Sequence, residues 1–169
     1  MEERSLEERV AALEERVAAL TARPEEIVAP NRHEQTFWAL EGLRAQIGDL
    51  EGGAVLYTGI VELSPTEHYE WQMGLPVQGL LEDDWSGPAT TLAALGHPVR
   101  LMLLKRVLQG VRNPADLAEQ EGLGTTGQIY HHLRQLVSAG WLRASARGVY
   151  EVPGERVIPL LALVMGAKR

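Results

Sequence analysis

The stretch GTTGQIYHHLRQLVSAGWL, residues 124–142, predicts an amphipathic helix that begins next to a capping residue. Thr125 stands three residues before Gln128, which is the spacing of a capping box, although Thr126 could serve as the cap instead. Apolar side chains recur behind the cap at the spacing of one helical face, namely Ile129, Leu133, Leu136 and Val137. We therefore expect a helix over residues 125–139 with one face buried in a core.

Side chains that can read DNA bases lie on the opposite face of this helix. Arginine can bond bidentately to guanine in the major groove, and glutamine can do the same to adenine. We expect DNA contacts at the start of the helix and on its polar face, from Thr125, Thr126, Gln128, Tyr130, His131 and Arg134. The alternatives are a phosphate contact or a solvated charge for Arg134, and a packed or surface position for His131.

The adjacent histidines of this helix, His131 and His132, do not predict a metal site. Neighbouring side chains on a helix point about 100° apart, whereas metal ligands on helices prefer spacings of three or four residues. The chain has no cysteine, which removes soft metal sites, thiolate nucleophiles and disulfides together. We expect no metal and no other cofactor, and we place His132 at the edge of the core.

A shorter helix is predicted directly before this one. In the segment NPADLAEQEG, Asn113 is a good cap and Pro114 suits the first helical position. A short helix, a turn with glycine and a longer helix follow one another in a helix-turn-helix. The next segment, RASARG, predicts a hairpin whose Arg143 and Arg147 can reach phosphates or a minor groove, as the wing of a winged helix does.

These segments resemble the ArsR-type winged-helix transcriptional regulators. The resemblance covers about residues 89–167 and rests on ALGHPVRLMLL, ADLAE, YHHLRQLVSAGWL and the hairpin in that order. With YEWQMG upstream, the layout is similar to a bacterial branch that has an N-terminal extension. The resemblance implies that residues 125–139 are a recognition helix and that terminal helices hold a homodimer. The candidate dimer contacts of the last helix are Val157, Leu160, Leu161 and Val164.

The metal sites familiar from this family are missing from the sequence. Its metal-sensing members use cysteine pairs, or aspartate and histidine on the last helix. This chain has no cysteine, and its last helix, from about Glu155, has no histidine and no carboxylate besides Glu155. Any small-molecule effector is therefore expected to be something other than a metal, and its identity is unknown.

A literal seven-residue repeat, LEERVAALEERVAAL, predicts an N-terminal coiled coil over residues 1–23. Its core positions are Leu6, Val10, Leu13, Val17 and Leu20. Valine at one core position and leucine at the other favour two parallel strands, which again indicates a dimer. The alternative is an amphipathic helix that packs on its own domain.

The segments between the coil and the winged helix predict a small module. Residues 24–31 contain two prolines and read as a linker, and a helix is expected from about Asn31 with Leu50 still on its apolar face. AVLYTGIVEL and EHYEWQMGL flank an SPT turn, which predicts a hairpin. We expect residues 32–86 to form this helix-plus-hairpin module, and residues 87–169 to form the DNA-binding and dimerisation domain. The fold class is mainly α (α+β).

Charge is distributed unevenly along the 169 residues. The chain has a net charge of −7, but its first 96 residues carry 18 acidic and 6 basic side chains, and the rest carry 5 and 10. A basic half in an acidic chain points to nucleic-acid contact by that half. The longest apolar run, at residues 157–166, is shorter than the roughly 20 residues that cross a membrane. We expect a cytoplasmic protein with no membrane partner.

The combined expectation is a homodimeric transcriptional regulator that binds double-stranded DNA at a pseudo-palindromic operator. An architectural DNA-binding module without a ligand, or a protein-interaction module that uses the winged helix and the coil, is the alternative. The sequence has no nucleophile–base pair, no glycine-rich phosphate loop and no metal cluster, so we do not expect an enzyme.

Overall fold

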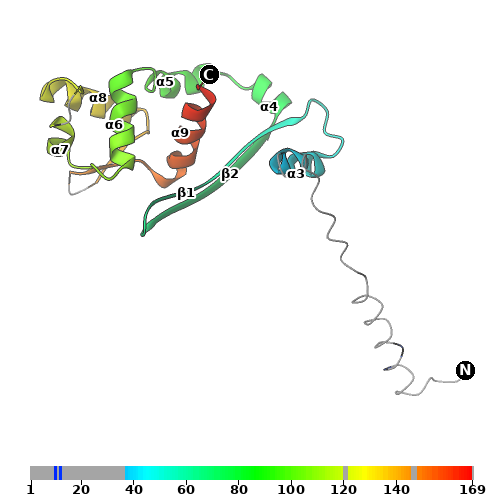
Figure 1. The fold of residues 1–169 in the computed structure, drawn as a ribbon. Coiled ribbons are helices and arrows are strands. Elements are labelled where there is room, and N and C mark those ends of the chain that lie inside the picture. Colours follow the sequence, from blue (N-terminus) through cyan, green and yellow to red (C-terminus); the bar gives the residue numbers. More distant parts are fainter. Residues whose placement is uncertain (1–9, 11, 13–36, 120–121, 146–147, 169) are drawn as a thin grey trace, which may run out of the picture. The chain divides into compact units, whose positions relative to one another are not determined.

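The computed structural model describes residues 10, 12, 37–119, 122–145 and 148–168. The chain divides into two compact units, Met1–Gly48 and Asp49–Arg169. Helix α3, Trp38–Ile47, lies in the first unit (Figure 1). Gly48 ends it with a positive φ of 52°, so Leu50 lies beyond the helix and not on its apolar face. The expected helix start near Asn31 lies outside the described residues.

The second unit contains the remaining described elements, in a mixed α/β arrangement. Its two sheets are antiparallel hairpins of two strands each. The elements are β1 (Ala54–Ser64), β2 (Glu67–Pro76), α4 (Val77–Glu82), α5 (Ser86–Ala93), α6 (Pro98–Leu108), α7 (Pro114–Ala118), α8 (Thr126–Ser138), β3 (Arg143–Ala144), β4 (Tyr150–Glu151) and α9 (Gly154–Gly166). Both hairpins were predicted from the sequence, whereas the short helix α4 was not.

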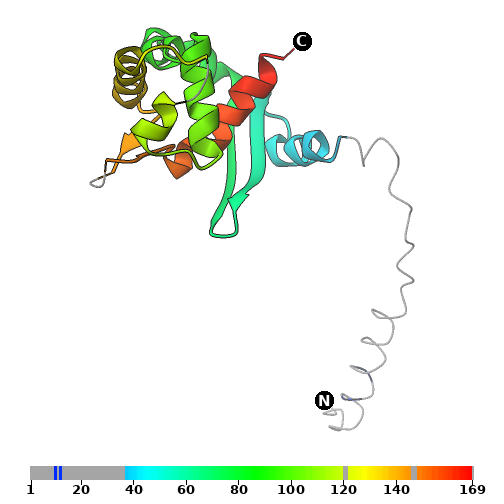
Figure 2. The same ribbon diagram turned by 60° about the vertical axis from the view of Figure 1, so that its left-hand side comes forward.

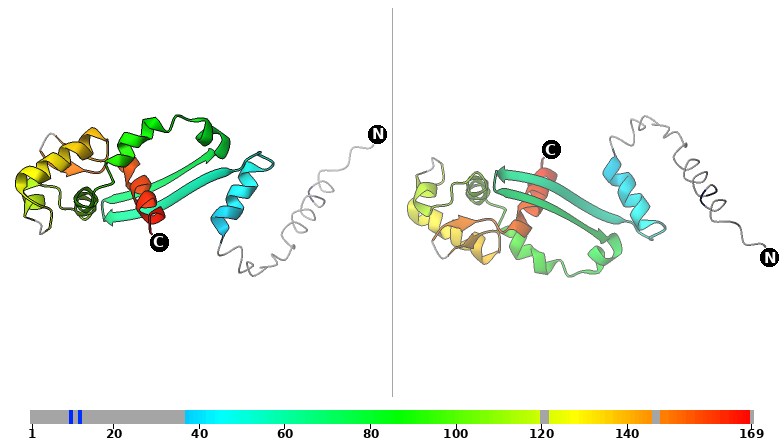
Figure 3. Two further views of the ribbon diagram at one scale, coloured as in Figure 1. Left: turned by 90° about the horizontal axis from the view of Figure 1, so that it is seen from above. Right: turned by 90° about the horizontal axis from the view of Figure 1, so that it is seen from below.

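The β1–β2 hairpin packs against α9, which crosses its strands (Figure 3). Gly59 allows the close approach, because a Cβ there would stand 2.9 Å from Cγ2 of Ile158. Gly154 does the same for the ring of Tyr69, at 3.2 Å. We expected a boundary between residues 86 and 87. In the structure the β1–β2 hairpin and the C-terminal helix α9 pack together within the second unit.

The core of the second unit lies between α6, α7, α8 and α9. Its most deeply buried side chains include Leu103, Leu104, Leu117, Leu133 and Trp141. Val61, Leu63 and Tyr69 of the β1–β2 hairpin pack against this cluster from outside. None of the helices that the structure describes is long and apolar enough to span a bilayer.

Two of the expected dimer contacts in α9 belong to this core. Val157 is 0 % exposed and Leu160 is 2 % exposed, so both are covered by side chains of their own chain. Leu161 and Val164 are each 37 % exposed and stay accessible. In the N-terminal repeat Val10 is described and is exposed, while Leu6, Leu13, Val17 and Leu20 lie outside the described residues.

Candidate nucleic-acid interface

Helix α7 begins as the sequence predicts. Asn113 is its N-cap, and the Asn113 side chain accepts a hydrogen bond from the Ala115 amide at 3.0 Å. Pro114 holds the first helical position, where a missing N–H costs nothing. Leu117 is fully buried and fixes the helix on the core. The connection to α8 then passes through Gly122, whose φ of 81° favours glycine.

A complete capping box starts α8. The Thr125 hydroxyl accepts from the Gln128 amide, and Gln128 Oε1 accepts from the Thr125 amide at 2.9 Å. The cap is therefore Thr125, and Thr126 is an exposed residue of the first turn. A Cβ at Gly124 would lie 2.6 Å from Gln128 Oε1, so the preceding glycine makes room for the box. Gln128 is committed to the cap, and reading an adenine with both amide atoms would require this bond to open.

The remaining length of α8 separates a buried face from an exposed one. Ile129, Leu133 and Leu136 are 0 % exposed, as their spacing predicts. Val137 was expected on the same face, but it is 37 % exposed. The other face carries the expected polar side chains Tyr130, His131 and Arg134, all exposed. Helix α8 packs on α6 and α7 and lies apart from the β1–β2 hairpin (Figure 2).

A histidine pair lies where α8 meets the start of α6. The rings of His97 and His132 are 4.5 Å apart between centroids. His97 caps α6 by accepting a hydrogen bond from the Val99 amide, and His132 Nδ1 is buried without a partner among the described residues. Burial lowers the pKa of His132, and His97, Arg100 and His131 lower it further. The described residues contain no group of three or more metal-ligating side chains close enough to hold an ion.

Arg100 joins α8 to α5, a role that the sequence analysis missed. Its Nη1 donates to the side-chain oxygen of Gln135 at 2.7 Å, and its Nη2 donates to the carbonyl of Ala93 at 3.0 Å. Its Nε also donates to the carbonyl of Ala94. These bonds satisfy carbonyls at the C-terminal end of α5, where a cation is favourable. They also tie Gln135 of α8 to the C-terminal end of α5.

The β3–β4 hairpin follows α8 and carries one described arginine. Arg143 faces Glu151 in the strand register, and Arg143 Nε donates to Glu151 Oε1 at 2.8 Å. The strands are only two residues long, and the Ser145 amide extends the pairing by donating to the Val149 carbonyl at 2.9 Å. The expected hairpin is therefore present. Arg147, the second arginine expected there, lies outside the described residues.

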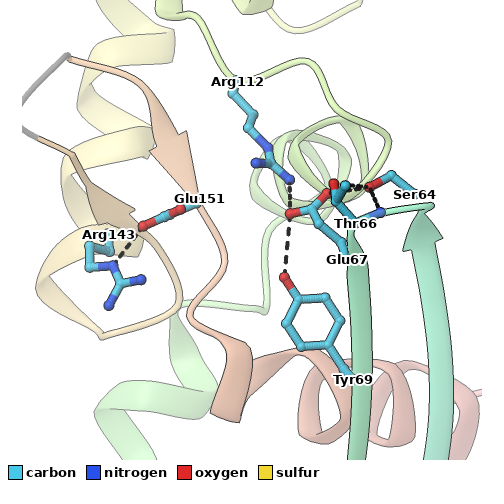
Figure 4. Close-up of polar contacts among 7 residues, drawn as sticks. All are labelled: Ser64, Thr66, Glu67, Tyr69, Arg112, Arg143 and Glu151. Carbon is cyan, nitrogen blue, oxygen red and sulfur yellow. Dashed lines mark hydrogen bonds and ion pairs between the residues drawn. The ribbon is translucent and has the colours of Figure 1, made fainter.

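A polar cluster connects the turn of the β1–β2 hairpin to the loop before α7 (Figure 4). Arg112 Nη2 donates to Glu67 Oε1 at 2.5 Å. Tyr69 and Ser64 donate their hydroxyls to the same carboxylate at 3.4 Å each. The hydrogen bond from Arg112 lowers the pKa of Glu67 below its ordinary value. Sequence analysis did not find this pair, because its members are 45 positions apart and neither stands in a motif.

An apolar groove lies between α5, α6 and α9. It has a volume of about 350 Å³, and Leu92, Leu95, Leu101, Leu163 and Val164 line it. Val164 is one of the two expected dimer contacts that remain accessible. The groove therefore adjoins the part of α9 that a second chain could cover.

No protein-family model matches the chain, and no curated protein and no solved structure was found to match it.

Proposed function

We propose that this chain is a sequence-selective regulator of transcription that binds double-stranded DNA with α8. One observation carries the proposal: the same helix holds three core side chains at 0 % exposure and presents an uncovered polar face on its other side. Such a helix is rigid, since its buried face and its capping box both fix it. A rigid helix with exposed arginine, histidine and tyrosine suits the major groove.

The positions of the basic side chains support the same proposal. Arg134 lies on the exposed face of α8, and Arg143 lies on the β3–β4 hairpin that follows it. We assign this hairpin the role of the wing, with Arg143 contacting a phosphate and Arg134 a base edge. The half of the chain that contains both elements is basic, although the chain as a whole is acidic. Phosphate contacts of this kind make affinity fall as salt rises.

We further propose that the regulator is a cytoplasmic homodimer of the ArsR winged-helix type. The seven-residue repeat of residues 6–20 favours two parallel chains, and Leu161 and Val164 leave an apolar surface on α9. Two copies of α8 would then enter successive major grooves, so half-sites should lie about one helical turn, ~10 bp, apart. Any effector would be a non-metal ligand, because the chain has no cysteine for a thiolate site.

Selection from a random duplex library tests the proposal. The full chain is incubated with the library at low and at high salt, and the bound duplexes are sequenced. We expect enrichment of a pseudo-palindrome, together with an affinity that falls steeply with salt. Binding without any enriched sequence would instead favour an architectural DNA-binding role, and no binding at either salt concentration would exclude the proposed function.

A further inference from the structure

The loop between α6 and α7 joins three parts of the second unit at Arg112. The carbonyl of Arg112 accepts a hydrogen bond from the Tyr150 amide of β4 at 2.8 Å. The next residue, Asn113, caps α7. The Arg112 side chain extends to Glu67 at the turn of the β1–β2 hairpin. A displacement of Arg112 would therefore shift both the β3–β4 hairpin and the start of α7.

Glu67 is itself held in place from two sides. Ser64 and Tyr69 donate hydroxyls to its carboxylate, and the ring of Tyr69 contacts Gly154 at the start of α9. The side chain of Glu67 is 25 % exposed and that of Arg112 is 31 % exposed. Partial burial makes this charge-assisted pair stronger than a solvated surface pair. The β1–β2 hairpin thus holds the Glu67 carboxylate in place, and this carboxylate in turn holds Arg112 in the loop before α7.

The β3–β4 hairpin needs such outside support. Each of its strands has two residues, and a two-stranded hairpin is marginal by itself in water. The Tyr150 amide bond to Arg112 ties β4 to the rest of the unit. Leu142 before β3 and Val152 after β4 are buried in the core, and the bond from Tyr150 to Arg112, whose side chain Glu67 holds, adds a further constraint on where the hairpin points.

We propose that Glu67 is a positioning residue for the wing: by holding Arg112 it sets the orientation of the β3–β4 hairpin toward DNA. The inference rests on the proposed function for its effect on DNA, and on the structure alone for its effect on the hairpin. The inference predicts an unusual sign for the change in DNA affinity. Removing a carboxylate from a DNA-binding protein ordinarily strengthens binding by reducing repulsion of phosphates, whereas here removal of the Glu67 charge weakens it.

Hydrogen exchange of the Tyr150 amide tests the effect on the hairpin, using the full chain. In Glu67→Gln we expect this amide to exchange roughly tenfold faster, the factor for losing one charge-assisted hydrogen bond. Glu70→Gln is the matched control, because Glu70 is a neighbouring carboxylate of β2 that is 67 % exposed and pairs with His68. It should leave the Tyr150 amide unchanged. An unchanged amide in Glu67→Gln would overturn the inference, whatever the DNA result.

DNA affinity tests the consequence for function. On a duplex enriched by the wild-type chain, Glu67→Gln should bind several-fold more weakly, and Glu70→Gln should bind equally or more tightly. In an Arg143→Ala background, Glu67→Gln should cause little further loss, because the wing contact is already gone. Tighter binding by Glu67→Gln, or an undiminished loss in the Arg143→Ala background, would overturn the positioning role.

Two further measurements separate this inference from other failures. If Glu67→Gln melts at a much lower temperature than the wild type, Arg112→Lys replaces it. That substitution keeps the cation but removes the planar fork of the guanidinium, and the same change in Tyr150 exchange is expected. If the wild-type chain enriches no duplex, the proposed function fails, while the exchange of Tyr150 still decides whether Glu67 holds the hairpin.

Discussion

Arg143 Nε donates a hydrogen bond to Glu151 Oε1 at 2.8 Å across the β3–β4 ladder (Figure 4). The side chain of Arg143 is 62 % exposed, so the pair is open to solvent and contributes little to stability. Under the proposed function, a phosphate that binds Arg143 would have to compete with the Glu151 carboxylate, which accepts from its Nε.

Glu151→Gln removes this competitor, and we expect tighter DNA binding as a result. The gain should be roughly two- to fivefold, the size of one exposed ion pair, and the dependence of affinity on salt should steepen. Titrations of a cognate duplex at several salt concentrations measure both quantities. Glu155→Gln, at the exposed start of α9, makes the same change in net charge. An equal gain in that control would show a general charge effect and contradict the competition.

Arg134→Ala should weaken binding by about 1–3 kcal/mol and relax the preference at one base position. The reason is that the Arg134 side chain lies on the exposed face of α8, where a bidentate contact with guanine would be lost. Competition between cognate and single-base variant duplexes measures the effect. Lys105→Ala, an exposed cation of α6, is the control. A loss of the same size on cognate and scrambled DNA would assign Arg134 to a phosphate.

Val164→Asp should dissociate the proposed dimer without unfolding the chain. Val164 is 37 % exposed beside the apolar groove, so a carboxylate there remains solvated in the monomer but is buried in a dimer. Sedimentation gives the mass, and circular dichroism gives the helix content. Val157→Asp places the same charge in the core, where the side chain is 0 % exposed, and should unfold the protein. An unchanged mass for Val164→Asp would show that α9 does not form the proposed dimer interface.

The lowered pKa of His132 predicts that the folded chain loses stability in mild acid. Its pKa is below the ordinary 6.5 in the folded chain, because burial and the neighbouring His97, Arg100 and His131 disfavour its cation. As the pH drops below 6.5, His132 becomes protonated in the unfolded chain before it does in the folded chain. The free energy of unfolding therefore falls between pH 6.5 and the lower pKa of the folded chain. This loss of stability is absent well above pH 6.5.

His132→Asn should remove this part of the pH dependence, although it can lower stability at neutral pH by changing the packing. Urea unfolding at several pH values between about 5 and 8 measures the slope. The control is His131→Asn, since His131 lies on the same helix but is exposed. A slope that stays the same in His132→Asn and disappears in His131→Asn would contradict the assignment.

Local patterns allowed much of the second unit to be predicted from sequence. The caps Asn113 and Thr125 each stand directly before a helix, and a cap acts within three residues of its own position. The SPT turn between two strand-like segments located β1 and β2, and helical spacing located the buried face of α8. In each case the signal lies among residues that are near one another in the sequence.

The features that sequence analysis missed depend on distant contacts. Arg112 and Glu67 meet only because the β1–β2 hairpin packs on α9, and Arg100 meets Gln135 only because α6 lies beside α8. The apolar character of α9 was clear, but the direction in which each side chain points was not. Val157 therefore belongs to the core and Val164 to the surface, although both are valines of one helix.

Amide chemical shifts during a titration with a selected duplex test the central claim most directly. We expect the amides of Thr126, Tyr130 and Arg134 on α8 and of Arg143 on β3 to move together and saturate at one dimer per duplex. Those of Ile60 and Glu70 on the β1–β2 hairpin should stay in place. Shifts confined to that hairpin, with the α8 amides unmoved at saturation, would contradict the assignment of α8 as the helix that reads DNA.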